Sequence, residues 1–194
     1  MDVFKIAVKI FAQSDDFAAN PFVPIFQRWI QNQSVEGHRL IDVADYGHVA
    51  AGPGTVLVGS EANFYTDRGE NRLGLLYSRK LPLPGSFGER LRAVVAETLK
   101  AAAKLEGEPE LGGKLKFKTD ELLIRLNDRL NAPPSDITVT ALGPDILSLA
   151  TLLYGEKPVT IDPNISAEKL VEFRLKASEA PSLATLVSKA ASGC

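Results

Sequence analysis

Residues 40–79 read LIDVADYGHVAAGPGTVLVGSEANFYTDRGENRLGLLYSR. This stretch contains three runs with the composition of β-strands, 40–49, 55–65 and 72–79, and the segments that join them are short and contain glycine. Parallel strands would need connections of about a dozen residues or more. The stretch therefore predicts an antiparallel meander, and this meander decides the fold class.

The flanking segments supply helices and further strands. Alternating apolar residues predict a strand over 3–12, and helical spacing predicts helices that begin near Pro21 and at Ser86, where Glu89 completes a capping box. The second half predicts a strand or hairpin over 114–127, a helix over 144–154 with Pro144 in its first turn, strands over 157–162 and 169–176, and a helix over 181–191. Residues 135–142 fit a strand or a helical turn.

These elements predict one α+β domain over residues 1–194, with a mostly antiparallel sheet and helices packed on one face. The polar segment 107–113, which contains glycine and proline, is a candidate sub-boundary within that domain. The two halves on either side show a similar order of elements, as a diverged duplication would.

The charge balance argues against nucleic acid and membrane surfaces as partners. The chain has 22 Lys and Arg against 24 Asp and Glu, a net charge of −2, with no long run of like charges. Its single cysteine, Cys194, excludes an intramolecular disulfide, and the two histidines lack metal-site spacing. We therefore expect a cytoplasmic protein without a metal or a cofactor.

The densest group of potentially catalytic residues lies in the first hairpin of the meander. Asp42, Tyr46 and His48 share one face of an extended strand, because side chains alternate. If His48 lies opposite Thr55, the same register places Asp42 opposite Glu61. Such a carboxylate pair with His48 would suit a hydrolase or isomerase, whereas a solvated polar face is the structural alternative.

Two further features bear on ligands. Asp45 and Tyr46 are candidate ligand-binding residues beside the carboxylate pair, and Arg129 is a candidate clamp for an anionic ligand, unless it pairs with Asp128.

His38 follows Gly37 at a helix exit, where a positive ring would stabilise the helix C-terminus.

An aromatic helix face favours self-association. The apolar side chains of this predicted helix offer more area than a small sheet can cover, unless they are buried within one chain; they are Phe22, Phe26, Trp29 and Ile30. The leading expectation is a non-enzymatic protein that binds a small molecule or self-associates as a homo-oligomer, and the alternative is the carboxylate-dependent enzyme.

Part of the chain resembles a group of uncharacterised bacterial proteins. The resemblance rests on four motifs, PIFQRWIQ at 24–31, IDVADY at 41–46, GPG with VLVG at 52–59 and LGLLY at 73–77. It implies that Gln31, Asp42, Asp45 and Tyr46 recur in that group, but no activity follows from it. It also implies a histidine before Glu61, where this chain has Ser60, and this departure weakens the case for an acid–base site.

Overall fold

The computed structural model describes residues 1–15, 17, 20–166 and 169–192, so the predictions about Cys194 lie outside the described residues. All strands form one eight-stranded sheet in the order β2-β3-β4-β5-β1-β6-β8-β7, and every neighbouring pair is antiparallel. The strands are β1 (Ile6–Ala12), β2 (Leu40–Tyr46), β3 (Gly54–Gly59), β4 (Ala62–Asp67), β5 (Gly74–Arg79), β6 (Phe117–Leu126), β7 (Val159–Ile165) and β8 (Val171–Ala177). The predicted α+β class is confirmed.

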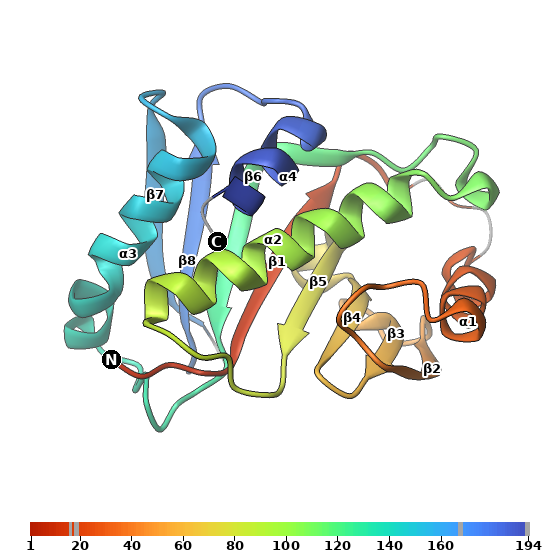
Figure 1. The fold of residues 1–194 in the computed structure, drawn as a ribbon, viewed down its shortest axis with the longest axis horizontal. Coiled ribbons are helices and arrows are strands. Elements are labelled where there is room, and N and C mark those ends of the chain that lie inside the picture. Colours follow the sequence, from red (N-terminus) through yellow and green to blue (C-terminus); the bar gives the residue numbers. More distant parts are fainter. Residues whose placement is uncertain (16, 18–19, 167–168, 193–194) are drawn as a thin grey trace.

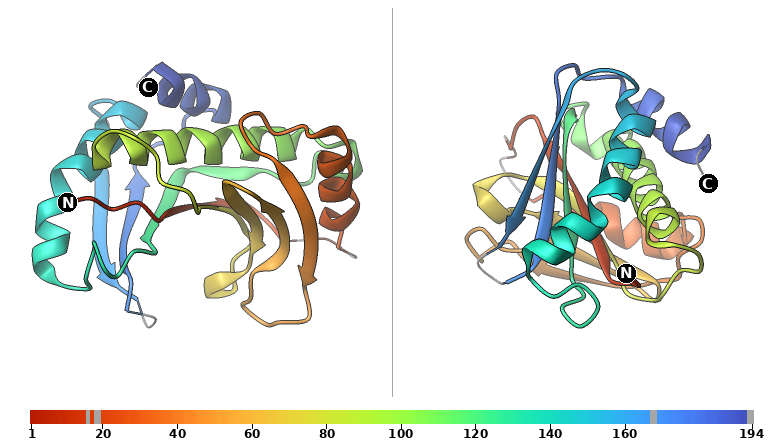
Figure 2. Two further views of the ribbon diagram at one scale, coloured as in Figure 1. Left: turned by 60° about the horizontal axis from the view of Figure 1, so that its bottom comes forward. Right: turned by 90° about the vertical axis from the view of Figure 1, so that its left-hand side faces the viewer.

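The helices cover one face of the sheet and leave the other face open (Figure 1). Helix α2 (Phe87–Glu106) crosses β1 and β5, α1 (Phe22–Asn32) packs on β2 and β3, α3 (Asp136–Tyr154) packs on β7 and β8, and α4 (Leu183–Ser192) lies on α2. The sheet bends away from the helices toward both ends, so its open face is concave (Figure 2). Strand β1 lies between β5 and β6, which joins the two halves of the chain in one sheet.

The predicted meander and the helix that begins after Ser86 are confirmed in place. Ser86 Oγ accepts the N–H of Glu89, and the Glu89 carboxylate accepts the N–H of Ser86 at 2.7 Å, so the capping box is complete. The predicted strand over 55–65 is wrong as one element. It contains the turn between β3 and β4, where a Cβ on Gly59 would lie 2.8 Å from the carbonyl oxygen of Ala62.

The prediction for the third helix is corrected at its start. Helix α3 begins at Asp136 rather than at Pro144, because Ser135 accepts the N–H of Thr138 and caps it there. Pro144 lies inside the helix. By length and composition, α3 is the one helix among the described residues that could cross a membrane; 39% of it is buried, and it packs against β7, β8, α2 and α4.

The aromatic face of α1 is buried within the chain. Phe22, Phe26 and Trp29 are at most 2% exposed, and the Trp29 indole N–H donates to Glu108 at 2.6 Å. Arg28 on the same helix forms ion pairs with Glu108 and Glu110, so the 107–113 segment is anchored on α1. The surface that suggested self-association is therefore part of the core.

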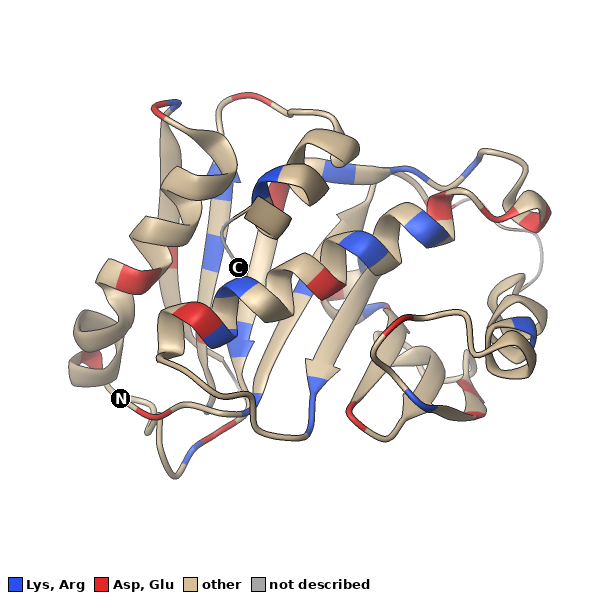
Figure 3. Ribbon diagram, viewed as in Figure 1, with Lys and Arg blue, Asp and Glu red and all other residues tan. Residues whose placement is uncertain are grey.

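The outer strands β2 and β7 have partners on one side only. At the start of β2 the Gln33 amide binds the backbone of Leu40 twice, accepting its N–H at 3.0 Å and donating to its carbonyl at 2.9 Å. Strand β7 contains Pro163, which lies opposite Phe173 of β8. Charged residues of both signs are spread along the elements on the helical side, including α2 (Figure 3).

Candidate functional site

The open face carries rows of side chains that the strand register defines. Directly paired residues project to the same face of a sheet. One row crosses five strands through Ser78, Ala7, Arg125, Glu172 and Asn164. The next row contains Leu76, Lys9, Leu123 and Arg174. Charged groups therefore meet an apolar floor near the middle of the sheet.

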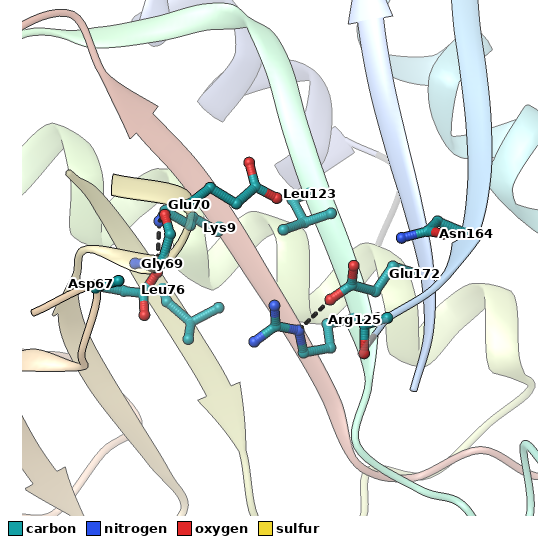
Figure 4. Close-up of a pocket in the computed structure, with 11 residues that line it drawn as sticks. Lys9, Asp67, Gly69, Glu70, Leu76, Leu123, Arg125, Asn164 and Glu172 are labelled. Carbon is teal, nitrogen blue, oxygen red and sulfur yellow. Dashed lines mark hydrogen bonds and ion pairs between the residues drawn. The ribbon is translucent and has the colours of Figure 1, made fainter. Parts of the chain in front are cut away.

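A cavity of about 410 Å³ lies over these rows. Leu76 and Leu123 contribute apolar surface, and Figure 4 shows the charged side chains of Lys9, Arg125 and Glu172 around the same space. Three connections, one after β2, one after β4 and one after β7, add Ala51, Gly69, Glu70 and Ser166 to the lining. The volume falls in the range of about 300–1,000 Å³ that small-molecule sites occupy.

Lys9 fixes one wall of the cavity. Its side chain is buried, and its ammonium group donates to Asp67 Oδ2 at 2.5 Å and to the carbonyl oxygens of Gly69 at 3.1 Å and Arg72 at 2.8 Å. Burial lowers the pKa of Lys9 below its ordinary value, and the ion pair with Asp67 opposes that shift. Because all three N–H groups are used, Lys9 holds the β4–β5 connection in place and leaves no donor for a ligand.

Gly74 makes room for this lysine. A Cβ at Gly74 would lie 2.6 Å from Lys9 Cε and 2.6 Å from the carbonyl oxygen of Ile10. The lysine stem thus lies directly over the β5 backbone, which only glycine permits at this distance.

Arg125 is the cation with unused donors. Its Nε donates to Glu172 Oε1 at 2.5 Å, and Glu172 is only 5% exposed, so the guanidinium is held in a fixed orientation. Among the described residues, neither terminal nitrogen of Arg125 forms a hydrogen bond. Figure 4 shows this end of the guanidinium pointing into the cavity.

An ion network lies next to the cavity and is joined to it through Glu70, which lines the cavity and pairs with Arg174. The buried Glu121 accepts two hydrogen bonds from Arg72, at 2.9 and 2.6 Å, and one from Arg174 at 2.7 Å. These bonds, those from Arg72 above all, lower the pKa of Glu121 to about 2. Arg72 also lies over the Phe11 ring at 3.8 Å, and Glu70 pairs with Arg174.

The site is balanced in charge and suited to binding. Four cationic side chains of the site, Lys9, Arg72, Arg125 and Arg174, form ion pairs with four acidic ones, Asp67, Glu70, Glu121 and Glu172. Within the described residues no group of three or more histidine, cysteine or acidic side chains could hold a metal ion. The arrangement offers a rigid arginine fork for an anion, next to carboxylates that can accept hydrogen bonds.

The predicted register of the β2–β3 hairpin is wrong. Asp42 lies opposite Val58 and Tyr46 opposite Gly54, so Asp42 does not face Glu61. The prediction placed Gly54 in the turn, but it belongs to β3. A Cβ there would lie 2.0 Å from the carbonyl oxygen of Thr66 on β4, and this close approach needs glycine.

The three predicted catalytic residues are separated as a result. His48 lies exposed in the turn after β2. Glu61 lies in the β3–β4 turn, where the N–H of Arg39 donates to it at 2.9 Å and lowers its pKa. Asp42 is exposed and accepts the N–H of Val43 at 2.8 Å.

The predicted ligand-binding residues also lie outside the cavity. Asp45 accepts hydrogen bonds from Asn20 at 3.1 Å and from Gly47 at 2.9 Å, which fixes the turn after β2. Tyr46 is 44% exposed, and Arg129 is exposed in the turn after β6. His38 does not cap a helix; it is buried against Tyr77 and Phe64.

The residues that form the cavity carried a weaker signal in the sequence. Glu121, Leu123 and Arg125 alternate along β6, and Glu172 and Arg174 alternate along β8, as expected for a polar face. The sequence does not indicate that β6 and β8 lie next to each other and next to β1.

Comparison of the chain with protein-family models, with curated proteins and with solved structures finds no match. The resemblance to uncharacterised bacterial proteins therefore stays a prediction.

Proposed function

We propose that this protein binds a small organic molecule that carries an anionic group, in the cavity on the open face of the sheet. The observation that supports this proposal is Arg125, whose terminal nitrogens face the cavity while Glu172 holds its Nε. A planar guanidinium binds a carboxylate or phosphate through two parallel hydrogen bonds.

The rest of the lining narrows the ligand class to hydroxy and amino acids. Leu76 and Leu123 would contact a short apolar stem. Carboxylate oxygens of Glu172 and Glu70 would accept hydrogen bonds from hydroxyl or amino groups, and they would repel a ligand that is anionic throughout. A molecule with one carboxylate and neighbouring donors satisfies both requirements.

Other parts of the original expectation stay as proposals. The cytoplasmic location stays a proposal, and a non-enzymatic role agrees with a cavity whose lysine is fully hydrogen-bonded. Self-association now requires a surface other than the α1 aromatic face. The hydrolase or isomerase built on Asp42, His48 and Glu61 loses its geometric basis, since the hairpin does not bring the three side chains together.

Isothermal titration calorimetry with a panel of hydroxy acids, amino acids and inorganic phosphate tests the proposal. The test variant is Arg125→Gln/Glu172→Gln, which removes both charges of the pair and strands neither. It should weaken binding about tenfold or more. The control is Arg39→Gln, because Arg39 is exposed and does not line the cavity. Equal affinity of the double variant and wild type would refute the proposal.

A further inference from the structure

A second cavity lies on the helical side of the sheet. Its volume is about 430 Å³, and it opens between α2, the end of β5 and the loop that precedes β2. His38 and Tyr77 are buried in its lining, Arg79 and Glu97 stand beside them, and Leu83 contributes apolar surface. This cavity shares no lining residue with the one on the open face.

The hydrogen bonds of His38 determine where its proton lies. Nδ1 is 2.9 Å from the carbonyl oxygen of Glu36, which can only accept, so Nδ1 carries a hydrogen. Nε2 is 2.9 Å from the Tyr77 hydroxyl. When His38 is neutral, Nε2 accepts and the Tyr77 hydroxyl donates to it. The Tyr77 oxygen then offers only lone pairs to its surroundings.

Protonation of His38 reverses this bond. Both ring nitrogens become donors, and Nε2–H donates to the Tyr77 oxygen. The hydroxyl hydrogen must then turn elsewhere. Arg79, whose Nη1 lies 3.5 Å from the Tyr77 oxygen, cannot accept it, because a guanidinium has no acceptor. The hydrogen is left to point toward the cavity, as burial raises the pKa of Tyr77 to about 12 and keeps the phenol protonated.

We propose that this second cavity binds a small carboxylate, and that protonation of His38 strengthens the binding. The carboxylate would accept from the Tyr77 hydroxyl and from Nη2 of Arg79, which forms no hydrogen bond within the described residues. The charged groups around His38 are Glu36 on its own loop, Glu61 after β3, Arg79 on β5, and Glu97 and Lys100 on α2. The acidic members disfavour an anion while His38 is neutral, which is why its added proton matters.

Proton NMR on the wild-type protein tests this directly with benzoate as the probe. The chain has two histidines, and the exposed His48 is an internal control for His38. Because linkage is reciprocal, a carboxylate that binds about tenfold tighter to the protonated form must raise the titration midpoint of His38 by about one pH unit at saturation. The His48 midpoint should not move. An unchanged or lowered His38 midpoint would overturn the proposal.

Two variants separate the hydrogen bond from the charge. In Tyr77→Phe the shift of the His38 midpoint caused by benzoate should fall below about half of the wild-type shift. The positive charge of protonated His38 remains in this variant, but the hydroxyl donor of Tyr77 is lost. Arg79→Gln should lose benzoate binding at both about pH 8 and about pH 5.5, on either side of the ordinary histidine pKa. Lys114→Gln is the control, because Lys114 is exposed and does not line this cavity. The full wild-type shift in Tyr77→Phe would refute the reversal of the bond.

All measurements are repeated with Arg125→Gln/Glu172→Gln, so that carboxylate on the open face cannot contribute. Thermal unfolding of each variant verifies that it is folded. If Tyr77→Phe does not fold, the wild-type titration of His38 still decides the outcome.

Discussion

Glu121→Gln should destabilise the protein by about 2 kcal/mol at neutral pH. Hydrogen bonds from Arg72 and Arg174 lower the pKa of this carboxyl from 4.5 to about 2, which corresponds to about 3 kcal/mol at about 1.4 kcal/mol per pH unit. The Arg72 side chain is 34% exposed, so solvent screens part of this interaction and the expected loss is smaller. Glutamine keeps the shape but removes the charge that binds both arginines, which retain only Glu70 as a shared acidic partner among the described residues.

The pH dependence gives the sharper test. A carboxyl whose pKa is lowered by folding stabilises the native state fully above the pKa of the unfolded chain, and this contribution disappears as the pH falls through the native value. The difference between wild type and Glu121→Gln should therefore be largest above about pH 5 and should shrink between pH 4.5 and about 2.

Urea denaturation at a series of pH values measures this difference. Glu156→Gln, at an exposed carboxylate in the connection before β7, should stay within about 0.5 kcal/mol of wild type throughout. A loss for Glu121→Gln below about 0.5 kcal/mol at pH 7, or a loss of the same size at every pH, would refute the reasoning.

Three further substitutions follow from the geometry. Gly74→Ala should lower the free energy of unfolding in urea by more than about 1 kcal/mol and weaken ligand binding on the open face. The new methyl group meets the Ile10 carbonyl, which cannot move, and displaces Lys9. An unchanged midpoint of urea denaturation would contradict this. Ser86→Ala should lower the stability by about 1 kcal/mol through loss of the capping box, whereas Ser86→Asp should retain most of it. Asp42→Asn should change the stability at pH 7 by less than about 0.5 kcal/mol, since its carboxylate is solvated. A clear gain in stability would instead indicate that a second carboxylate lies close to Asp42 and repels it.

The individual helices and strands could be predicted well from the sequence, but the pairing of the strands in the sheet could not. Local signals, such as the Ser86 capping box and the alternation in β1, depend on residues a few positions apart, and those predictions are confirmed. The predicted hairpin register depended on whether Gly54 belongs to the turn or to the strand. Glycine is required at this position because the backbone of Thr66, on another strand, lies too close for a side chain. No local pattern encodes that contact.

The candidate site was missed for the same reason. Lys9, Asp67, Arg125 and Glu172 come from four strands, and the pairing of β1 with β6 joins residues more than 100 positions apart. Each residue alone reads as an ordinary surface charge. Residues close in sequence, such as Asp42 and His48, attracted the functional interpretation because their proximity was visible without the fold.

The backbone polar groups at the outer edges of β2 and β7 bear on whether a strand from another molecule can extend the sheet. Unpaired backbone donors and acceptors at a sheet edge are a template for strand addition from another molecule, and this is a common start of fibrous aggregation. Here Gln33 occupies both polar groups of Leu40, the Asp42 carboxylate occupies the N–H of Val43, and Pro163 has no N–H to offer. These groups are therefore not free to pair with an added strand. Asp42, which looked catalytic in the sequence, binds a backbone N–H of the outer strand in the folded chain.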